Sequence, residues 1–217
     1  MNDKTALFFG SKVVVISAVA VVSFLLSLWM TRQLCVTTKR WQILDYPNER
    51  SLHVSPVPRT GGLAILLVIL LNLYLAAQIM VVPSLLYWLA GSLLPLAAVA
   101  WLDDWRGVPP VWRLTIQIVV TLMLLLGSGL LSNFALWGHD PLVGGAVLLA
   151  AVLCMVWMVN LYNFMDGMDG MAGGMAAIGF ACFAILGWLA GNQLFSWLAA
   201  GIAGAASGFL VFNFPPA

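Results

Sequence analysis

The chain has 217 residues, of which 63% are hydrophobic and 8% are charged, and its formal net charge at pH 7 is +1. Its mean hydropathy is +1.03, so most of the chain cannot face water. This composition excludes an ordinary soluble domain, and the small net charge without a basic cluster argues against nucleic-acid binding. We expect one integral-membrane domain over residues 1–217: an all-α, polytopic bundle of transmembrane helices in the lipid bilayer.

Seven apolar segments are long enough to cross a membrane, because about 20 residues at about 1.5 Å each span roughly 30 Å of hydrocarbon. The uncharged stretch 61–102 is too long for one helix, and Pro83 divides it, since proline begins a helix more readily than it continues one. Gly191 and Asn192 divide the last stretch. The first span is too long for a signal sequence, so we expect it to be retained. The predicted spans are 12–31, 61–81, 84–102, 113–131, 142–161, 171–190 and 194–212.

The charged residues gather on one side of this predicted bundle. With seven crossings, residues 32–60, 103–112, the loop near 166 and the C-terminus share one side. That side receives seven of the nine basic residues, and the positive-inside rule makes it cytoplasmic. Acidic residues contribute little to orientation, yet six of the eight acids lie there as well. The cytoplasmic loops are therefore the expected site, with the acids Asp45, Glu49, Asp103, Asp104, Asp166 and Asp169.

The segment 160–174 places two amides and two carboxylates between two apolar runs: Asn160, Asn163, Asp166 and Asp169. Beside hydrocarbon, each such group costs roughly several kcal/mol unless a metal, a ligand or water receives it. The alternative is a glycine-rich turn whose aspartates cap the next helix. One cap needs only one acceptor, so the doubled Asp-Gly unit favours a functional site.

Asp103 and Asp104 form a second polar cluster at the end of an apolar span. Adjacent carboxylates repel each other unless a cation lies between them, and proteins usually hold Mg²⁺ with one or two carboxylates plus substrate phosphate oxygens. The pair therefore indicates metal-bridged phosphate, with two acids that only mark a helix end as the alternative. The segment 45–62 is rich in turn formers and includes His53, and an ordinary solvated loop is its alternative.

Three motifs together resemble a known family. They are Asp-Tyr-Pro-Asn-Glu-Arg-Ser-Leu-His at 45–53 followed by Pro-Arg-Thr-Gly-Gly at 58–62, Asp-Asp at 103–104, and Asn-Leu-Tyr-Asn-Phe-Met-Asp-Gly-Met-Asp-Gly-Met-Ala-Gly-Gly at 160–174. In this order they resemble the polyprenyl-phosphate N-acetylhexosamine-1-phosphate transferases, which are bacterial family 4 glycosyltransferases. The branch that begins O-antigen and related surface glycans is the most similar one.

The resemblance implies a multi-pass enzyme of the bacterial inner (cytoplasmic) membrane whose active face is cytoplasmic. Such an enzyme transfers N-acetylhexosamine-1-phosphate from UDP-N-acetylhexosamine to undecaprenyl phosphate and releases UMP. It begins lipid-linked glycan synthesis for lipopolysaccharide or the cell wall. Mg²⁺ is the expected cofactor, with Mn²⁺ as an alternative ion, and a homodimer stays open.

The resemblance also implies roles for the residues that match its motifs. Asp103 and Asp104 are the expected catalytic residues, and with Asp166 they are the expected Mg²⁺ ligands. Arg113 occupies a position where many relatives have a lysine; its guanidinium keeps the charge and adds a planar fork for phosphate. The expected substrate-binding residues are His53, Arg113, Asn160, Asn163, Asp166 and Asp169.

One departure from the family concerns the end of the sequence. After residues 213–217 the family continues with a Phe-x-Gly-Asp-x-Gly loop that supplies another active-site aspartate. We therefore expect the 217-residue chain to insert into membranes but not to catalyse alone, and a catalytically inactive membrane fragment stays open. A small-solute transporter is a further alternative, although transporters more often place ionisable groups mid-span, where this chain has none.

The lopsided charges lead to a prediction about topology. In a chain without its three native cysteines, Arg50→Cys, Arg106→Cys and Met168→Cys should react with an impermeant thiol reagent from one compartment. His139→Cys should react from the other, because successive loops of a polytopic chain alternate. Mixed accessibility among the first three would rule out a site on one face.

Overall fold

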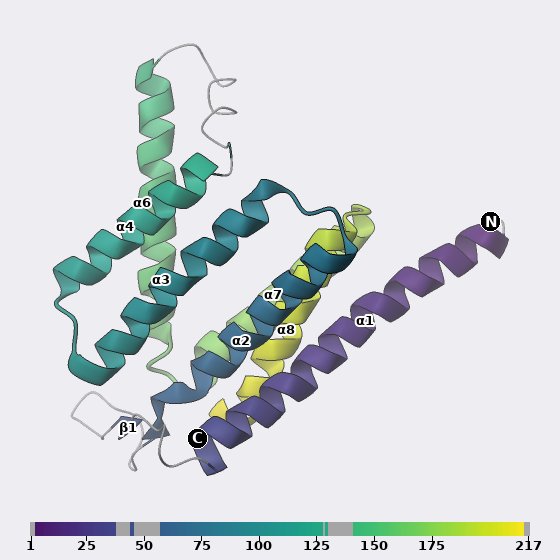
Figure 1. Ribbon diagram of the computed structural model, residues 1–217, viewed down its shortest axis with the longest axis horizontal. Coiled ribbons are helices and arrows are strands. Elements are labelled where there is room, and N and C mark those ends of the chain that lie inside the picture. Colours follow the sequence, from purple (N-terminus) through teal and green to yellow (C-terminus); the bar gives the residue numbers. More distant parts are fainter. Residues whose placement is uncertain (1–2, 38–43, 46–56, 128, 130–140, 215–217) are drawn as a thin grey trace. The chain divides into compact units, whose positions relative to one another are not determined.

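The computed structural model describes residues 3–37, 44–45, 57–127, 129 and 141–214 (Figure 1). Seven of its helices are long and apolar enough to cross a membrane, so the predicted all-α, seven-span architecture is confirmed. The described helices are α1 (Asp3–Thr31), the π-helix η1 (Arg32–Thr37), the 3₁₀ turn η3 (Arg59–Gly61), α2 (Gly62–Ile79), α3 (Ser84–Arg106), α4 (Pro110–Gly127), α6 (Pro141–Met165), α7 (Met171–Leu189) and α8 (Gln193–Asn213).

The breaks between the helices lie where the turn-forming residues predict them. Pro83 precedes the first residue of α3 in an extended conformation, and Pro95 lies inside α3 without ending it. Gly191 adopts a left-handed conformation (φ 73°), and the side chain of Asn192 caps α8 by accepting a hydrogen bond from the N–H of Phe195 at 3.1 Å. Left-handed geometry favours glycine, and an N-cap amide satisfies one of the free N–H groups that open a helix.

The described residues form two compact units, each described by itself below. The first unit comprises Met1–Val81 and Asp166–Ala217, and the second comprises Val82–Met165. The first therefore contains α1, α2, α7 and α8, and the second contains α3, α4 and α6.

The small residues of α8 let the helices of the first unit pack closely around it. A side chain at Gly204 would collide with the carbonyl of Ala20 on α1, and one at Gly208 would collide with the carbonyl of Phe24. Both contacts advance by four residues along each helix, so α1 and α8 run in the same direction. The hydroxyl of Ser27 donates to the carbonyl of Ala205 at 2.7 Å in the same seam. This is the small-residue packing expected between helices in lipid.

A buried amide ties α2 into this group. The Nδ2 of Asn72 donates to the Oγ of Ser23 on α1 at 3.0 Å and to the carbonyl of Val68 at 2.8 Å. On α8, a Cβ at Gly201 would lie 2.8 Å from the Cγ of Asn72, so only glycine leaves room for the amide. An amide in the middle of a span needs such partners because hydrocarbon supplies none.

The two ends of the first unit differ in character. At one end, β1 (Leu44–Asp45) pairs antiparallel with β2 (Val57–Pro58), which η3 connects directly to α2. There the Oγ1 of Thr60 lies 3.8 Å from the Sγ of Cys35, which follows α1, and Gly61 packs against the ring of Phe209 on α8. The predicted cytoplasmic loop 32–60 is thus anchored where α1 and α8 end.

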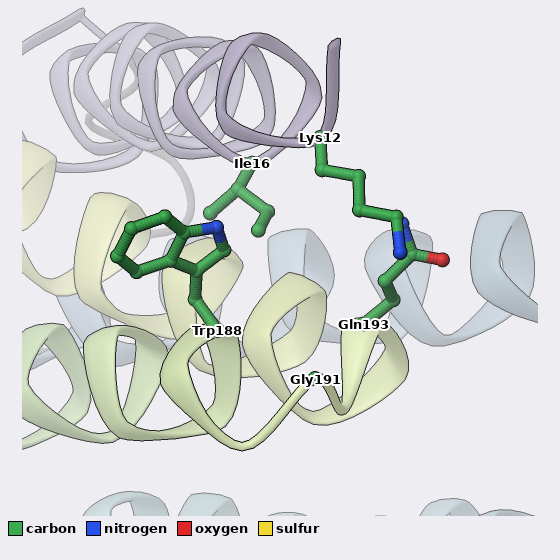
Figure 2. A pocket seen from close by; sticks show the side chains of 5 residues that line it. All are labelled: Lys12, Ile16, Trp188, Gly191 and Gln193. Carbon is green, nitrogen blue, oxygen red and sulfur yellow. The ribbon is translucent and has the colours of Figure 1, made fainter. Parts of the chain in front are cut away.

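The other end holds a small pocket of about 30 Å³, lined by Lys12, Ile16, Trp188, Gly191 and Gln193 (Figure 2). In Figure 2 the lysine of α1 extends toward the side chain of Gln193 at the α7–α8 turn. This volume suits about one water molecule. α7 has 19 residues and is therefore roughly 28 Å long at about 1.5 Å per residue. The pocket lies at one end of this helix and Asp169 precedes the other end.

The second unit is built from α3 and α4, which run antiparallel side by side, and from α6, which packs on α4 (Figure 1). Gly127 at the end of α4 packs directly against the ring of Trp88 on α3. Three polar side chains are buried in this unit: Ser92, Gln117 and Thr121. The hydroxyl of Ser92 donates to the carbonyl of Trp88 at 2.7 Å within its own helix.

The close approach of α1 and α8 predicts opposite effects for one substitution at two glycines. Gly179→Ala in α7 meets open space and should stabilise the protein by ~0.5–1 kcal/mol, as alanine does inside helices. Gly204→Ala should instead destabilise it by about 1–3 kcal/mol, because the new methyl meets backbone that cannot move aside. Unfolding of the detergent-solubilised chain measures both, and equal effects would contradict the described seam.

Candidate active-site residues

Asp103 lies in the last turn of α3 and is held by two neighbours. Its Oδ1 accepts a hydrogen bond from the backbone N–H of Val108 at 2.8 Å, and its Oδ2 pairs with Nη1 of Arg113 at 2.7 Å. α3 ends because Gly107 is left-handed (φ 67°), and α4 begins at Pro110, whose fixed φ suits a first helical position. The carboxylate of Asp103 therefore links the end of α3 to the start of α4.

The Asp103–Arg113 ion pair orients these side chains more than it stabilises the fold. The side chains of Arg113 and Asp103 are 35% and 24% exposed. An ion pair this accessible to solvent contributes about 1 kcal/mol or less. Each carboxylate oxygen offers two lone-pair directions, so Asp103 retains acceptor capacity after making both contacts.

Asp104 is half-buried and follows Asp103 on the helix. Successive helical residues differ by about 100° around the axis, so the two carboxylates leave α3 in different directions. The guanidinium of Arg106 lies 4.4 Å from the ring centroid of Trp105. Trp105 and Trp112 are both largely exposed, as in the aromatic belts of membrane–water interfaces. The α3–α4 turn thus combines adjacent acids with arginines and interfacial tryptophans.

The side chains of Gln117 on α4 and Asn160 on α6 form an amide pair that joins these two helices. The Nδ2 of Asn160 donates to the Oε1 of Gln117 at 2.7 Å and to the carbonyl of Val156 at 2.8 Å. The Nε2 of Gln117 lies 3.5 Å from the Oδ1 of Asn160, which closes the pair weakly. Asn163, one turn closer to the end of α6, is exposed. Both N–H groups of the Asn160 amide are therefore used within the protein.

The segment 166–170 leads from α6 into α7 through a series of turns. Gly170 is left-handed (φ 73°), and its N–H donates to the Oδ1 of Asn213, the last residue of α8, at 3.0 Å. A Cβ at Gly173 would lie 3.2 Å from Leu210, so glycine lets the start of α7 approach α8 closely. Asp166 and Asp169 precede the positive end of the α7 dipole, which stabilises negative charge.

The structure brings some of the predicted site residues together. In the second unit Asp103 contacts Arg113, Asp104 adjoins it, and Asn160 and Asn163 lie near the end of α6. Asp166 and Asp169 belong to the first unit, and His53 lies outside the described residues. In neither unit do three described His, Cys, Asp or Glu side chains converge on one point. The expected metal ligands Asp103, Asp104 and Asp166 therefore draw on both units.

Three contacts at the site were not anticipated from the sequence. The N–H of Val108, the side chain of Gln117 and the side chain of Asn213 each hold a predicted site residue or the loop beside it. Gln117 carried a signal, because it follows Arg113 by one helical turn and is an isolated amide in an apolar span. A backbone N–H carries none.

The two contacts of Asp103 predict different outcomes for two substitutions. Asp103→Asn keeps a carbonyl oxygen for the N–H of Val108 and loses only the exposed ion pair, so stability should fall by about 1 kcal/mol or less. Asp103→Ala also leaves that N–H without its acceptor and should cost a further ~1 kcal/mol. Unfolding of the purified chain measures both, and equal losses would show that the Val108 bond contributes nothing.

Comparison with known proteins gives relatives that match this chain over most of its length. A probable undecaprenyl-phosphate N-acetylglucosaminyl 1-phosphate transferase of Bacillus subtilis (strain 168) is 28% identical over 204 residues, covering 91% of this chain and 56% of that protein. A decaprenyl-phosphate N-acetylglucosaminephosphotransferase of Mycobacterium leprae (strain TN) is 30% identical over 140 residues, covering 64% and 29% respectively. The protein of the same description from Mycobacterium tuberculosis (strain ATCC 25618 / H37Rv) is 28% identical over 140 residues, covering 64% and 28%.

The chain therefore spans about half of one of these relatives and less than a third of the others. No solved structure matches it. The family profile described as glycosyl transferase family 4 matches residues 85–217, which include α3 from its second residue, α4, α6, α7 and α8. Every residue with a predicted catalytic, metal-binding or substrate-binding role except His53 lies within this match. Because that match covers more than half of the sequence, this multi-pass membrane chain belongs to glycosyl transferase family 4.

Proposed function

We propose that this chain carries the phosphate-handling part of an enzyme that transfers N-acetylhexosamine-1-phosphate from a UDP-sugar to undecaprenyl phosphate. UMP is the second product, and the lipid-linked sugar begins a surface glycan of the O-antigen type. The observation that carries the proposal is the carboxylate of Asp103, held by Arg113 and the N–H of Val108 beside Asp104 at the end of a membrane span. The names of the relatives support the same class of acceptor and sugar phosphate.

The position of the α3–α4 turn suits a substrate whose tail is lipid and whose reactive group is phosphate. Trp105 and Trp112 are exposed beside the acids, as expected of side chains at the headgroup level. A polyprenyl phosphate places its phosphate at that same level while its chain stays in hydrocarbon. Arg106 and Arg113 supply positive charge there, and arginine binds phosphate through a planar, bidentate fork.

The donor set of the site fits Mg²⁺. Asp103, Asp104 and Asp166 offer hard carboxylate oxygens, and Asp103 keeps free lone-pair directions after its two contacts. We propose that these three residues hold the ion, with Mn²⁺ as a substitute. When bound, the ion neutralises phosphate charge that would otherwise repel the attacking group. Arg113 keeps Asp103 in a fixed direction, so the carboxylate is oriented before substrate arrives.

The proposed reaction is one phosphoryl transfer. An oxygen of the lipid phosphate attacks the sugar-bearing phosphorus, the bond from that phosphorus to the bridging oxygen breaks, and UMP leaves with the bridging oxygen. The lipid phosphate needs little help from a base, because its second pKa of ~6 leaves it mostly dianionic at neutral pH. Positioning and charge neutralisation therefore carry most of the catalysis. Asn163, Asp166, Asp169 and His53 are proposed to bind the nucleotide-sugar.

The proposed location is the bacterial cytoplasmic membrane, with the site on the cytoplasmic face where UDP-sugars are made. Within each unit, the segments predicted to be cytoplasmic lie at one end. Asn213 meets the start of α7 in the first unit, and the α3–α4 turn lies at the same end as the last turn of α6 in the second.

A transfer assay tests the proposal. Membranes containing the chain, alone or with the remaining part of the Bacillus subtilis relative supplied as a separate polypeptide, are incubated with radiolabelled UDP-N-acetylglucosamine, undecaprenyl phosphate and Mg²⁺. With the remaining part supplied we expect a labelled lipid and equimolar UMP, both abolished by a chelator, and from the chain alone we expect neither. Labelled lipid in neither preparation would contradict the proposal. Decaprenyl phosphate and other UDP-N-acetylhexosamines define the preferred substrates.

Substitution of Asp104 predicts a loss that is specific to the reaction. In the preparation that includes the remaining part, Asp104→Asn preserves shape but removes the charge that attracts the ion, so turnover should fall on the order of 100-fold or more, with membrane insertion unchanged. Asp3→Asn, the same change on the opposite predicted side, serves as the control and should leave turnover unaltered. Near-normal turnover in Asp104→Asn would contradict its role as a metal ligand.

A further inference from the structure

The side chains of Gln117 on α4 and Asn160 on α6 form a hydrogen bond between the two helices, close to the predicted site. The side chain of Gln117 is 8% exposed, and it meets Asn160 at 2.7 Å from the neighbouring helix. The second N–H of the Asn160 amide donates to the carbonyl of Val156 in its own helix. An amide with both N–H groups committed has no donor left for a phosphate or a nucleobase.

The pair also contributes much of what fixes the depth of α6. Of the α6 side chains that the structure describes, Val156 and Met165 are buried, and most of the rest are exposed. An apolar helix in lipid changes little in free energy when it shifts along its axis, because lipid tails are as apolar as its side chains. An amide that must find its partner within hydrogen-bond distance has only one good register.

That register determines which residues stand level near the site. In Figure 1 α4 and α6 cross with opposed chain directions, so with Gln117 meeting Asn160 the turn that carries Arg113 and the last turn of α6 lie on the same side of that meeting point. Arg113 lies one turn, or roughly 6 Å, from Gln117, and Asn163 lies about 4.5 Å along α6 from Asn160. Arg113 and Asn163 therefore each lie about one helical turn from the Gln117–Asn160 contact, on the same side of it.

We propose that Gln117 is a positioning residue that acts through Asn160. By accepting the Asn160 N–H it fixes the depth of the last turn of α6 and so holds Asn163 level with Arg113. Asn160 belongs to the same device and touches no substrate. The consequence for substrate rests on the proposed function, in which Asn163 and Arg113 receive the UDP-sugar; the consequence for helix register does not.

The first experiment measures register without any substrate. Thr121 and Val156 are both buried; Thr121 lies four residues after Gln117 and Val156 four residues before Asn160, so both lie about one turn from the amide pair, on the side away from the predicted site. In a chain without native cysteines, Thr121→Cys with Val156→Cys should form a disulfide readily under mild oxidation. Adding Gln117→Leu should lower the cross-linking rate by about tenfold, because leucine accepts no hydrogen bond from Asn160. An unchanged rate would overturn the proposal.

The second experiment measures affinity for UDP-N-acetylglucosamine with Mg²⁺ in the full 217-residue chain. Gln117→Leu and Asn160→Leu should each weaken binding by about tenfold, and the double variant should be no weaker than either single one, since the two residues act as a unit. Exchanging the amides, with Gln117→Asn and Asn160→Gln together, should restore affinity to within about threefold. Thr115→Val, which removes a hydroxyl bonded only to its own helix, should change neither readout.

The outcomes separate the two proposals. Loss of binding in Asn160→Leu with normal binding in Gln117→Leu would show that Asn160 is itself a ligand and would overturn the positioning role. Multiplicative losses in the double variant would overturn it as well. If the unsubstituted chain binds no UDP-sugar, either alone or with the remaining part of the Bacillus subtilis relative supplied, while cross-linking still depends on Gln117, the proposed function fails and the register device stands.

Discussion

Amide side chains in this protein lie in or beside hydrocarbon, and the need to give them hydrogen-bond partners determines how several of the helices meet. Asn72 reaches Ser23 on α1 and fits against Gly201 on α8. Gln117 reaches Asn160 across the α4–α6 contact. A lost partner costs more here than in water, because no solvent replaces it. The few amides of the chain therefore specify contacts that apolar packing alone leaves open.

The same constraint acts at the site, where it produces orientation instead of packing. The oxygens of Asp103 are held by Val108 and Arg113, and Gly170 is held by Asn213. The end of α3 and the loop before α7 are thus each held by a neighbouring helix or turn in their own unit. A reaction that depends on charge neutralisation gains from carboxylates whose direction is fixed beforehand, since no reorganisation is then needed during the reaction.

The sequence predicted the architecture well because hydrophobic length is a strong signal in membranes. Pro83 and Gly191 marked the helix boundaries. The site was predicted as a set of acids on one face, but the partners of those acids were not. The Val108 contact is made by backbone, and Gln117 meets Asn160 only after two helices pack, so neither contact has a local sequence pattern.

The central claim is that the acids at the end of α3 hold a metal ion that contacts substrate phosphate. Mn²⁺ in place of Mg²⁺ makes this contact directly visible by electron spin resonance, through hyperfine coupling of the ion to phosphorus nuclei. With UDP-N-acetylglucosamine present, the account predicts phosphorus coupling in the unsubstituted chain and its loss in Asp104→Asn. Coupling that persists unchanged in Asp104→Asn, or bound Mn²⁺ without any phosphorus coupling, would contradict it.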